Sequence, residues 1–205
     1  MVAQQLRQRG ISDERVLAAM AKVPRHEFVS QQNWPEAYAD HPIPIAEQQT
    51  TSQPYMIAAM VQAAGVKPED RVLEVGAGSG YQTAVLAELA SQVFAVERYD
   101  SLTEAARTTL ERLGYRNAKV VTGDGSLGFP EAAPYDAIIV SAAAPRIPPA
   151  LVEQLAMGGR LIVPVGESDQ QVVQLVQRNA DGTTSIRTLE GCRFVPLIGQ
   201  QGFAA

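Results

Sequence analysis

Short apolar runs alternate with longer segments of helical periodicity from residue 71 onward. Continuous runs of valine, leucine and isoleucine are typical of strands that are buried on both faces of a parallel sheet. The sequence predicts such strands at residues 72–75, 93–97, 118–121, 135–141 and 160–165. Helices are predicted between them at residues 81–89, 102–113 and 148–155. Strands that alternate with helices indicate an α/β fold, here a doubly wound, mostly parallel sheet.

The end of the chain has a different pattern. Residues 171–178 and 184–189 alternate apolar with polar side chains, and Asp181-Gly182 lies between them. Alternation on both sides of an Asp-Gly pair favours a β-hairpin, so we predict that an antiparallel hairpin follows the parallel strands. Residues 194–197 are predicted as a last short extended piece.

The first 65 residues precede this pattern as an N-terminal extension. Residues 1–30 are predicted to be helical, with Ser12 as a helix N-cap and Pro24 as a helix end. The prolines of residues 34–44 predict irregular chain there. A helix is predicted to open at Gln53-Pro54 and to run to about residue 64, which places Ser52 as its N-cap on local pattern alone.

A glycine-rich turn follows the first predicted strand. Glycines at 76, 78 and 80 give G-x-G-x-G, which differs from the G-x-G-x-x-G that seats a dinucleotide pyrophosphate. Glu74 lies inside the strand before the turn, and Glu97 ends the second strand, where a carboxylate can accept both ribose hydroxyls. We therefore expect a nucleotide-like ligand here, in preference to a turn whose glycines serve packing alone.

Further candidate residues follow the other strands. Gly123-Asp124-Gly125 comes after the third strand, and residues 141–144 come after the fourth. Ligands of open α/β sheets bind beyond the carboxyl ends of the strands, so these segments should converge on one crevice. Asp124 is placed there to accept an adenine amino group, although an Asp-Gly turn would also explain it.

Composition narrows the function classes. The chain has 205 residues, 46% of them apolar, and a net charge of −5 with no basic run, which argues against a nucleic-acid partner. Cys192 is the sole cysteine, and His26 and His41 are the only histidines, so metal binding has little support. With neither a signal peptide nor an apolar run of membrane-spanning length, we expect one cytoplasmic domain, residues 1–205, without a membrane partner.

Several stretches together resemble the protein-L-isoaspartate O-methyltransferase family. The glycine turn and the two acidic positions are shared with class I methyltransferases, which use S-adenosylmethionine (AdoMet) on a Rossmann-like sheet. Thr-x-Ser-x-Pro and the Val-Pro-Leu tail are the family-specific parts. The resemblance runs nearly end to end and is carried by Arg25-His26, Phe28-Val29, and residues 50–54, 72–81, 123–125, 133–138, 164–166 and 194–197.

The resemblance implies a role for individual residues. Ser52 corresponds to the active-site serine, and the substrate contacts implied are Ile45, Ser52 and Val195. Gln200 or Gln201 would close over the cofactor. The AdoMet contacts implied are Gln49, Thr50, Thr51, Glu74, Gly76, Ala77, Gly78, Ser79, Gly80, Glu97, Arg98, Asp124 and Gly125. The family further implies a monomer that methylates the α-carboxylate of isoaspartyl residues in damaged proteins and so initiates their repair. Ala46 and Thr51 depart from the usual glycine and isoleucine, which bears on peptide selectivity.

The chemistry agrees with residues that the sequence lacks. A carboxylate is already ionised at neutral pH, so its methylation needs no general base, and no serine–histidine–acid relay has a plausible spacing. Holding the carboxylate oxygen in line with the methyl group can supply most of the catalysis. Three other functions remain open: methylation of another carboxylate, a non-catalytic AdoMet-binding module, and a nicotinamide oxidoreductase, which the glycine spacing disfavours most.

Overall fold

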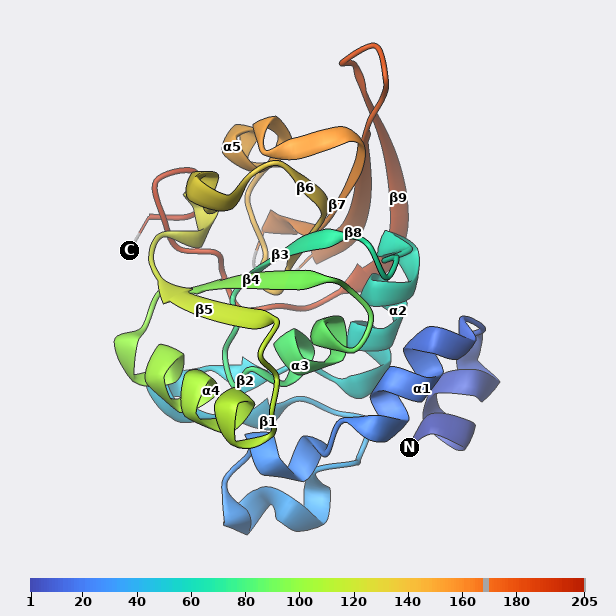
Figure 1. Cartoon of the computed structure of the whole chain (residues 1–205), viewed down its shortest axis with the longest axis vertical. Helices are drawn as coiled ribbons and strands as arrows, with labels where there is room; N and C mark the ends of the chain where they lie inside the picture. The colour runs from blue at the N-terminus through green and yellow to red at the C-terminus, as the bar shows by residue number, and fades with distance from the viewer. Residues whose placement is uncertain (168–169, 205) are drawn as a thin grey trace.

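A seven-stranded sheet forms the centre of the computed structural model, which describes residues 1–167 and 170–204 (Figure 1). The strand order is β5-β4-β3-β6-β7-β8-β9. Neighbouring strands from β5 to β7 run parallel, whereas β8 and β9 are antiparallel additions. The strands are β3 Arg71–Val75, β4 Gln92–Glu97, β5 Ala118–Thr122, β6 Tyr135–Val140, β7 Leu155–Glu167, β8 Gln170–Arg178 and β9 Thr184–Cys192. The predicted α/β sheet and its C-terminal hairpin are thus confirmed.

Helices cover both faces of this sheet. One face packs against α1 Glu14–Lys22, α2 Pro54–Ala64, α3 Tyr81–Ala87 and α4 Asp100–Arg112, and the other against α5 Pro149–Glu153 (Figure 1). Side chains alternate along β3 accordingly. Val72 contributes to the first core and Leu73 to the second, and both are fully buried. The continuous apolar runs of the sequence reflect this double burial.

The start of α1 corrects one prediction. Asp13, not Ser12, is its N-cap, and the Asp13 carboxylate accepts the backbone N–H groups of Arg15 and Val16. The backbone N–H of Ser12 instead donates to Gln62 Oε1 at 2.8 Å. Gln62 Oε1 also accepts the Asp13 N–H, at 2.9 Å, so α2 binds the backbone at the start of α1. Both residue types cap helices well, and local pattern alone did not separate them. The helix ends at Lys22, two residues before Pro24, as predicted.

Residues 31–51 are more ordered than the prolines suggest. A 3₁₀ turn spans Gln31–Glu36, and β1 Ile43–Pro44 pairs with β2 Thr50–Thr51 as a small antiparallel ribbon. Between these two strands Glu47 and Gln48 both adopt positive φ angles of 57°. The prediction of irregular chain over residues 34–44 was therefore wrong in part. It missed a hairpin that presents residues 45–49 beside the glycine turn.

The strand predicted at 160–165 is longer than expected. β7 begins at Leu155, which pairs with Tyr135, and an irregularity in the ladder separates that pair from Ala137 and Arg160. The preceding helix stops at Glu153. None of the helices in residues 1–167 and 170–204 is long and apolar enough to cross a membrane. Those residues also bring no three histidine, cysteine, aspartate or glutamate side chains together as metal ligands.

Candidate active site

The carboxyl ends of four parallel strands meet in one crevice, as predicted. The order of the strands reverses between β3 and β6, which is where open α/β sheets leave room for a ligand. There the Ser141 N–H donates to the Val75 carbonyl at 2.8 Å, and the Gly76 N–H donates to the Val96 carbonyl at 2.8 Å. The Gly123 N–H donates to the Glu97 carbonyl at 2.9 Å. These bonds hold the loops after β3, β5 and β6 to the ends of β3 and β4.

The glycine turn depends on backbone geometry that other residues rarely adopt. Gly76, Gly78 and Gly80 have φ angles of 87°, 53° and 85°, in the left-handed region. A Cβ at Gly80 would also lie 3.1 Å from the Cβ of Ala106 in α4. Gly80 therefore lets α3 begin directly against α4.

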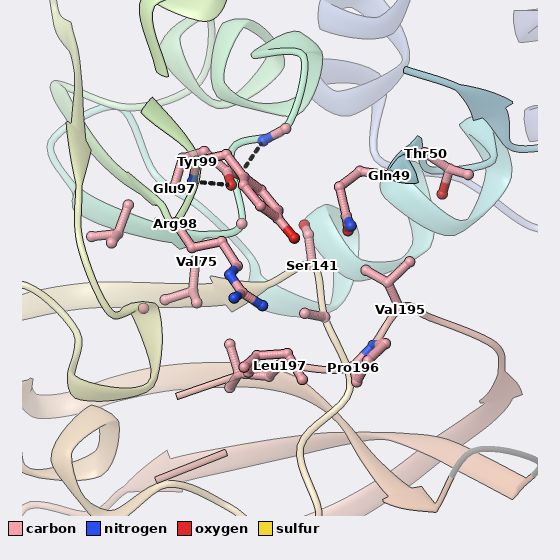
Figure 2. Close-up of a pocket in the computed structure, with 16 residues that line it drawn as sticks. Gln49, Thr50, Val75, Glu97, Arg98, Tyr99, Ser141, Val195, Pro196 and Leu197 are labelled. Atoms are coloured by element: carbon pink, nitrogen blue, oxygen red, sulfur yellow. Dashed lines mark hydrogen bonds between the residues drawn. The ribbon is translucent and has the colours of Figure 1, made fainter. Parts of the chain in front are cut away.

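Glu97 links this turn to the end of β4. Its Oε2 accepts the Gly78 N–H at 2.9 Å and its Oε1 accepts the Tyr99 N–H at 3.1 Å, as the dashed lines in Figure 2 show. The residue is 5% exposed and lines the cavity beside the turn. Each carboxylate oxygen has a second lone pair, so Glu97 can still accept a pair of ribose hydroxyls.

We call this space the strand-end cavity. Its walls combine aliphatic side chains with a few polar groups, a combination that suits a nucleoside. Arg98 and Tyr99 project into it, and the Arg98 guanidinium carbon lies 4.8 Å from the centre of the Tyr99 ring (Figure 2). The lining residues are Gln49, Thr50, Val75, Gly76, Gly78, Val96, Glu97, Arg98, Tyr99, Gly125, Ser141, Ala142, Val195, Pro196, Leu197 and Ile198.

Two neighbouring hollows open beside the strand-end cavity. The first, the tail cleft, lies between α2 and the end of β9 and is lined by Pro42, Thr50, Ser52, Gln53, Met56, Ser141, Gly191, Cys192, Arg193, Phe194 and Val195. The second, the serine pocket, is lined by Thr50, Thr51, Ser52, Ile57, Glu74, Gly76, Ala77, Gly78, Ser79, Gln82 and Ser141. Ser52 lines both hollows, and Val195 lines the tail cleft and the strand-end cavity.

Ser52 is not a helix cap. The N-cap of α2 is Gln53, whose side chain makes no capping bond. Instead Asp40 Oδ1 accepts the Tyr55 N–H at 3.0 Å, and Asp40 Oδ2 accepts Gln53 Nε2 at 2.8 Å. The carboxylate of Asp40, from a distant loop, thus accepts a backbone N–H that the first turn of the helix leaves free. The predicted capping role of Ser52 is wrong, and its half-buried side chain faces the hollows.

A buried cation holds the backbone at Ser52. Arg25 is fully buried, and its Nη2 donates to the Ser52 carbonyl at 2.8 Å. Its guanidinium carbon lies 4.6 Å from the centre of the Tyr81 ring. Burial lowers the pKa of Arg25, and the polar interaction with Tyr81 and the charge of Asp40 offset this only in part. The sequence singled out Arg25 only as part of a family motif, and the structure adds its contact with the Ser52 loop.

Glu74 lies deeper than a cofactor contact would require. It is fully buried and accepts Gln82 Nε2 at 3.0 Å and Thr83 Oγ1 at 2.5 Å. Burial raises the pKa of Glu74 to about 8, against the opposing effect of these two bonds. It lines the serine pocket but not the strand-end cavity. The AdoMet contact implied for it stays a prediction.

Asp124 holds the end of the chain. Its Oδ1 accepts the N–H and hydroxyl of Ser126, and its Oδ2 accepts the Gln200 N–H at 2.7 Å. Burial acts to raise the pKa of Asp124, but the bonds from Gln200 and Ser126 lower it overall. Gly125, not Asp124, lines the cavity. The adenine contact of Asp124 stays a prediction, and the structure adds the role of tethering residues 198–203.

Ile45 is separate from the other two predicted substrate residues. Its Cδ1 lies 3.5 Å from the position that a Cβ on Gly78 would take, and it lines a groove with Ser79 and Leu102. Ser52 and Val195 share the tail cleft instead. The sequence placed Ser141 at the crevice but missed other cavity residues, among them Tyr99 and Leu197. Tyr99 lies two residues beyond the strand predicted at 93–97, and that position is a signal that could have found it.

The family model that matches this chain and two of its curated relatives carry the same family name. The family model for protein-L-isoaspartate(D-aspartate) O-methyltransferase matches residues 1–202. Protein-L-isoaspartate O-methyltransferase of Koribacter versatilis is 55% identical over 204 residues, which cover 100% of this chain and 91% of the relative. The enzyme of that name from Methanoculleus marisnigri is 52% identical over 204 residues, covering 99% of this chain and 92% of the relative.

Solved structures agree. A protein-L-isoaspartate O-methyltransferase superposes with a TM-score of 0.86 at 32% identity, over 96% of this chain and 64% of that one, so this chain spans less than two thirds of its length. A second structure of this kind, from Plasmodium falciparum in complex with S-adenosyl-L-homocysteine, has a TM-score of 0.83 at 28% identity and covers 96% of both chains.

Proposed function

Because the chain belongs to the protein-L-isoaspartate(D-aspartate) O-methyltransferase family, we propose that it methylates the free α-carboxylate of isoaspartyl residues in peptides and proteins. It is an AdoMet-dependent carboxyl methyltransferase, and its product is S-adenosyl-L-homocysteine. The observation that carries the assignment is the junction of the strand-end cavity with the tail cleft at Val195, beside the loop that bears Ser52.

The strand-end cavity fits AdoMet. Glu97 offers two carboxylate oxygens for the ribose, while Val75, Val96 and Leu197 offer flat apolar contacts for the adenine. The turn at Gly76 and Gly78 presents backbone without side chains to the methionine part. When bound, AdoMet supplies a methyl carbon whose bond to the positively charged sulfur breaks as a carboxylate oxygen attacks it.

The protein has to position the substrate rather than activate it. A carboxylate is ionised at neutral pH, so the residues of the tail cleft need only hold it in line and exclude water. Ser52 orients the carboxylate through a hydrogen bond, and Arg25 keeps the Ser52 backbone in place. The backbone of the substrate peptide lies extended between the Ser52 loop and the segment at Val195. That segment is held in place because the Val195 carbonyl accepts the Ala143 N–H at 2.8 Å.

This geometry predicts the choice of substrate. An isoaspartyl linkage routes the main chain through the side-chain carbonyl and leaves the α-carboxylate as a short branch. A normal aspartate carries its carboxylate one methylene further from the main chain. A displacement of about 1 Å can cost on the order of 100-fold in rate, so the two linkages should differ strongly in turnover.

We also propose a biological setting for this activity, namely the repair of damaged proteins. Methylation of isoaspartyl residues starts the repair of damaged proteins, and we expect a monomer that works in the cytoplasm without a nucleic-acid partner. Residues 1–65 supply helices and the substrate loop, and residues 66–205 supply the AdoMet-binding sheet of a single domain.

A matched pair of peptides tests the proposal. One peptide contains isoaspartate and its twin contains aspartate at the same position, and both are incubated with methyl-labelled AdoMet. We expect rapid labelling of the isoaspartyl peptide, little of its twin, and a base-labile ester that releases methanol. Equal labelling of both, or labelling of neither by protein that binds AdoMet, would favour the runner-up, methylation of a different carboxylate.

A further inference from the structure

Two side chains stand where the three hollows of the site meet. Thr50 and Ser141 each line the strand-end cavity, the tail cleft and the serine pocket, and both are labelled in Figure 2. If the proposed function holds, methyl donor and carboxylate meet at this junction. Thr50 is exposed on a two-residue strand, whereas Ser141 is half-buried at the end of β6. Ser141 is therefore the more rigidly placed of the two hydroxyl groups.

The Ser141 hydroxyl is oriented from inside the protein. Gln82 Nε2 donates to Ser141 Oγ at 2.9 Å and also donates to Glu74 Oε1 at 3.0 Å. Gln82 is 6% exposed and Glu74 is fully buried, so the amide is held in place. Since Ser141 Oγ accepts from Gln82, its own hydrogen is left to donate, and no hydrogen bond within residues 1–167 and 170–204 uses it.

Resting on the proposed function, we propose that Ser141 is a second hydrogen-bond donor to the substrate carboxylate, and that Gln82 is the positioning residue that aims it. The carboxylate loses its negative charge as the ester forms, so a donor on the attacking oxygen would weaken the nucleophile. Ser141 serves the reaction by holding the other oxygen. With Ser52 it fixes the plane of the carboxylate from two sides.

Steady-state kinetics of Ser141→Ala with the isoaspartyl peptide test this role. Loss of a bond to a charged group should lower kcat/KM about 10- to 100-fold. Because the bond acts on the bound carboxylate, the change should appear chiefly as a higher KM. The AdoMet dissociation constant, measured by calorimetry, should stay at the wild-type value. Ser141→Thr keeps the hydroxyl and should restore most of kcat/KM. Ser185→Ala, which removes an exposed hydroxyl from β9, is the control for loss of a hydroxyl elsewhere.

A double-mutant cycle separates positioning from stability. Gln82→Met removes the donor at similar volume and should raise KM in the wild-type background but add little to Ser141→Ala, because the two act on one hydroxyl. Additive effects, unchanged kcat/KM in Ser141→Ala, or an altered AdoMet affinity in that variant would each overturn the proposal. Wild-type protein that fails to label the isoaspartyl peptide refutes the proposed function instead, so the two failures are distinguishable.

Discussion

Glu74→Gln tests how the protein accommodates an acid in its core. Glu74 is fully buried, and burial raises its pKa from 4.5 to about 8. In the folded protein the neutral acid can donate to Thr83 Oγ1 and accept from Gln82 Nε2. A glutamine reproduces both bonds, with Nε2 toward Thr83 and Oε1 toward Gln82, and carries no charge at any pH. The substitution therefore removes the ionisation and leaves the shape.

The sign of the effect follows from proton binding. Between pH 4.5 and 8 the unfolded chain has released the proton of Glu74 while the folded chain retains it. Stability from this group is therefore fully present below pH 4.5 and is lost as the pH rises toward 8. The loss is about 1.4 kcal/mol per pH unit, or roughly 5 kcal/mol over the whole interval. Glu74→Gln should lack this dependence and gain stability over wild type as the pH rises.

Urea denaturation at pH 5, 6, 7 and 8 measures the effect. All other titrating groups are shared, so the difference in unfolding free energy between wild type and Glu74→Gln isolates Glu74. Glu111→Gln, at an exposed position of α4, is the matched control for replacing a glutamate at the surface. Parallel curves for wild type and Glu74→Gln would refute the reasoning, because Glu74 would then be ionised in the folded protein at the same pH as in the unfolded chain.

Three further predictions concern the site. Glu97→Ala should weaken AdoMet binding in calorimetry by roughly 1.5–3 kcal/mol per ribose hydrogen bond lost, and unchanged affinity would mean that Glu97 serves only Gly78 and Tyr99. Ser52→Ala should depress methyl transfer strongly with the melting temperature and AdoMet affinity near wild type; normal turnover would exclude the orienting role. Gly199→Ala should cost about 1–3 kcal/mol of stability and loosen AdoMet, because its Cβ would overlap Asp124 Oδ1 beside the cavity; an unchanged melting temperature would contradict this.

The sequence predicted the parts of the fold that local pattern determines. Strands β3 and β6 are buried on both faces, so their apolar runs are continuous and their limits are correct within one residue. The glycine turn was equally readable, since left-handed backbone at Gly76, Gly78 and Gly80 restricts the choice of residue. Position at a strand end was enough to bring Glu97 to the crevice.

Local sequence pattern could not predict hydrogen bonds between distant segments of the chain. Ser52 looked like a cap because the sequence could not show Asp40 arriving at the first turn of α2. Asp13, not Ser12, caps α1, and Gln62 of α2 accepts the backbone N–H groups of both residues. The tether between Asp124 and Gln200 joins residues that are 76 positions apart. In each case a polar group was satisfied by a partner that no local pattern reveals.

In the proposed function, cofactor binding and substrate choice reside on different parts of the chain. The glycine turn follows β3 and Glu97 ends β4, whereas the tail cleft is built from residues 42–56 and 191–195 together with Ser141. The two parts meet because the Ala143 N–H and carbonyl bond to Val195 and Leu197. A relative could therefore alter residues of the tail cleft, and accept a different carboxylate, without losing AdoMet. Ser141 lies on the boundary, so its substitution should change the use of the substrate while the cofactor still binds.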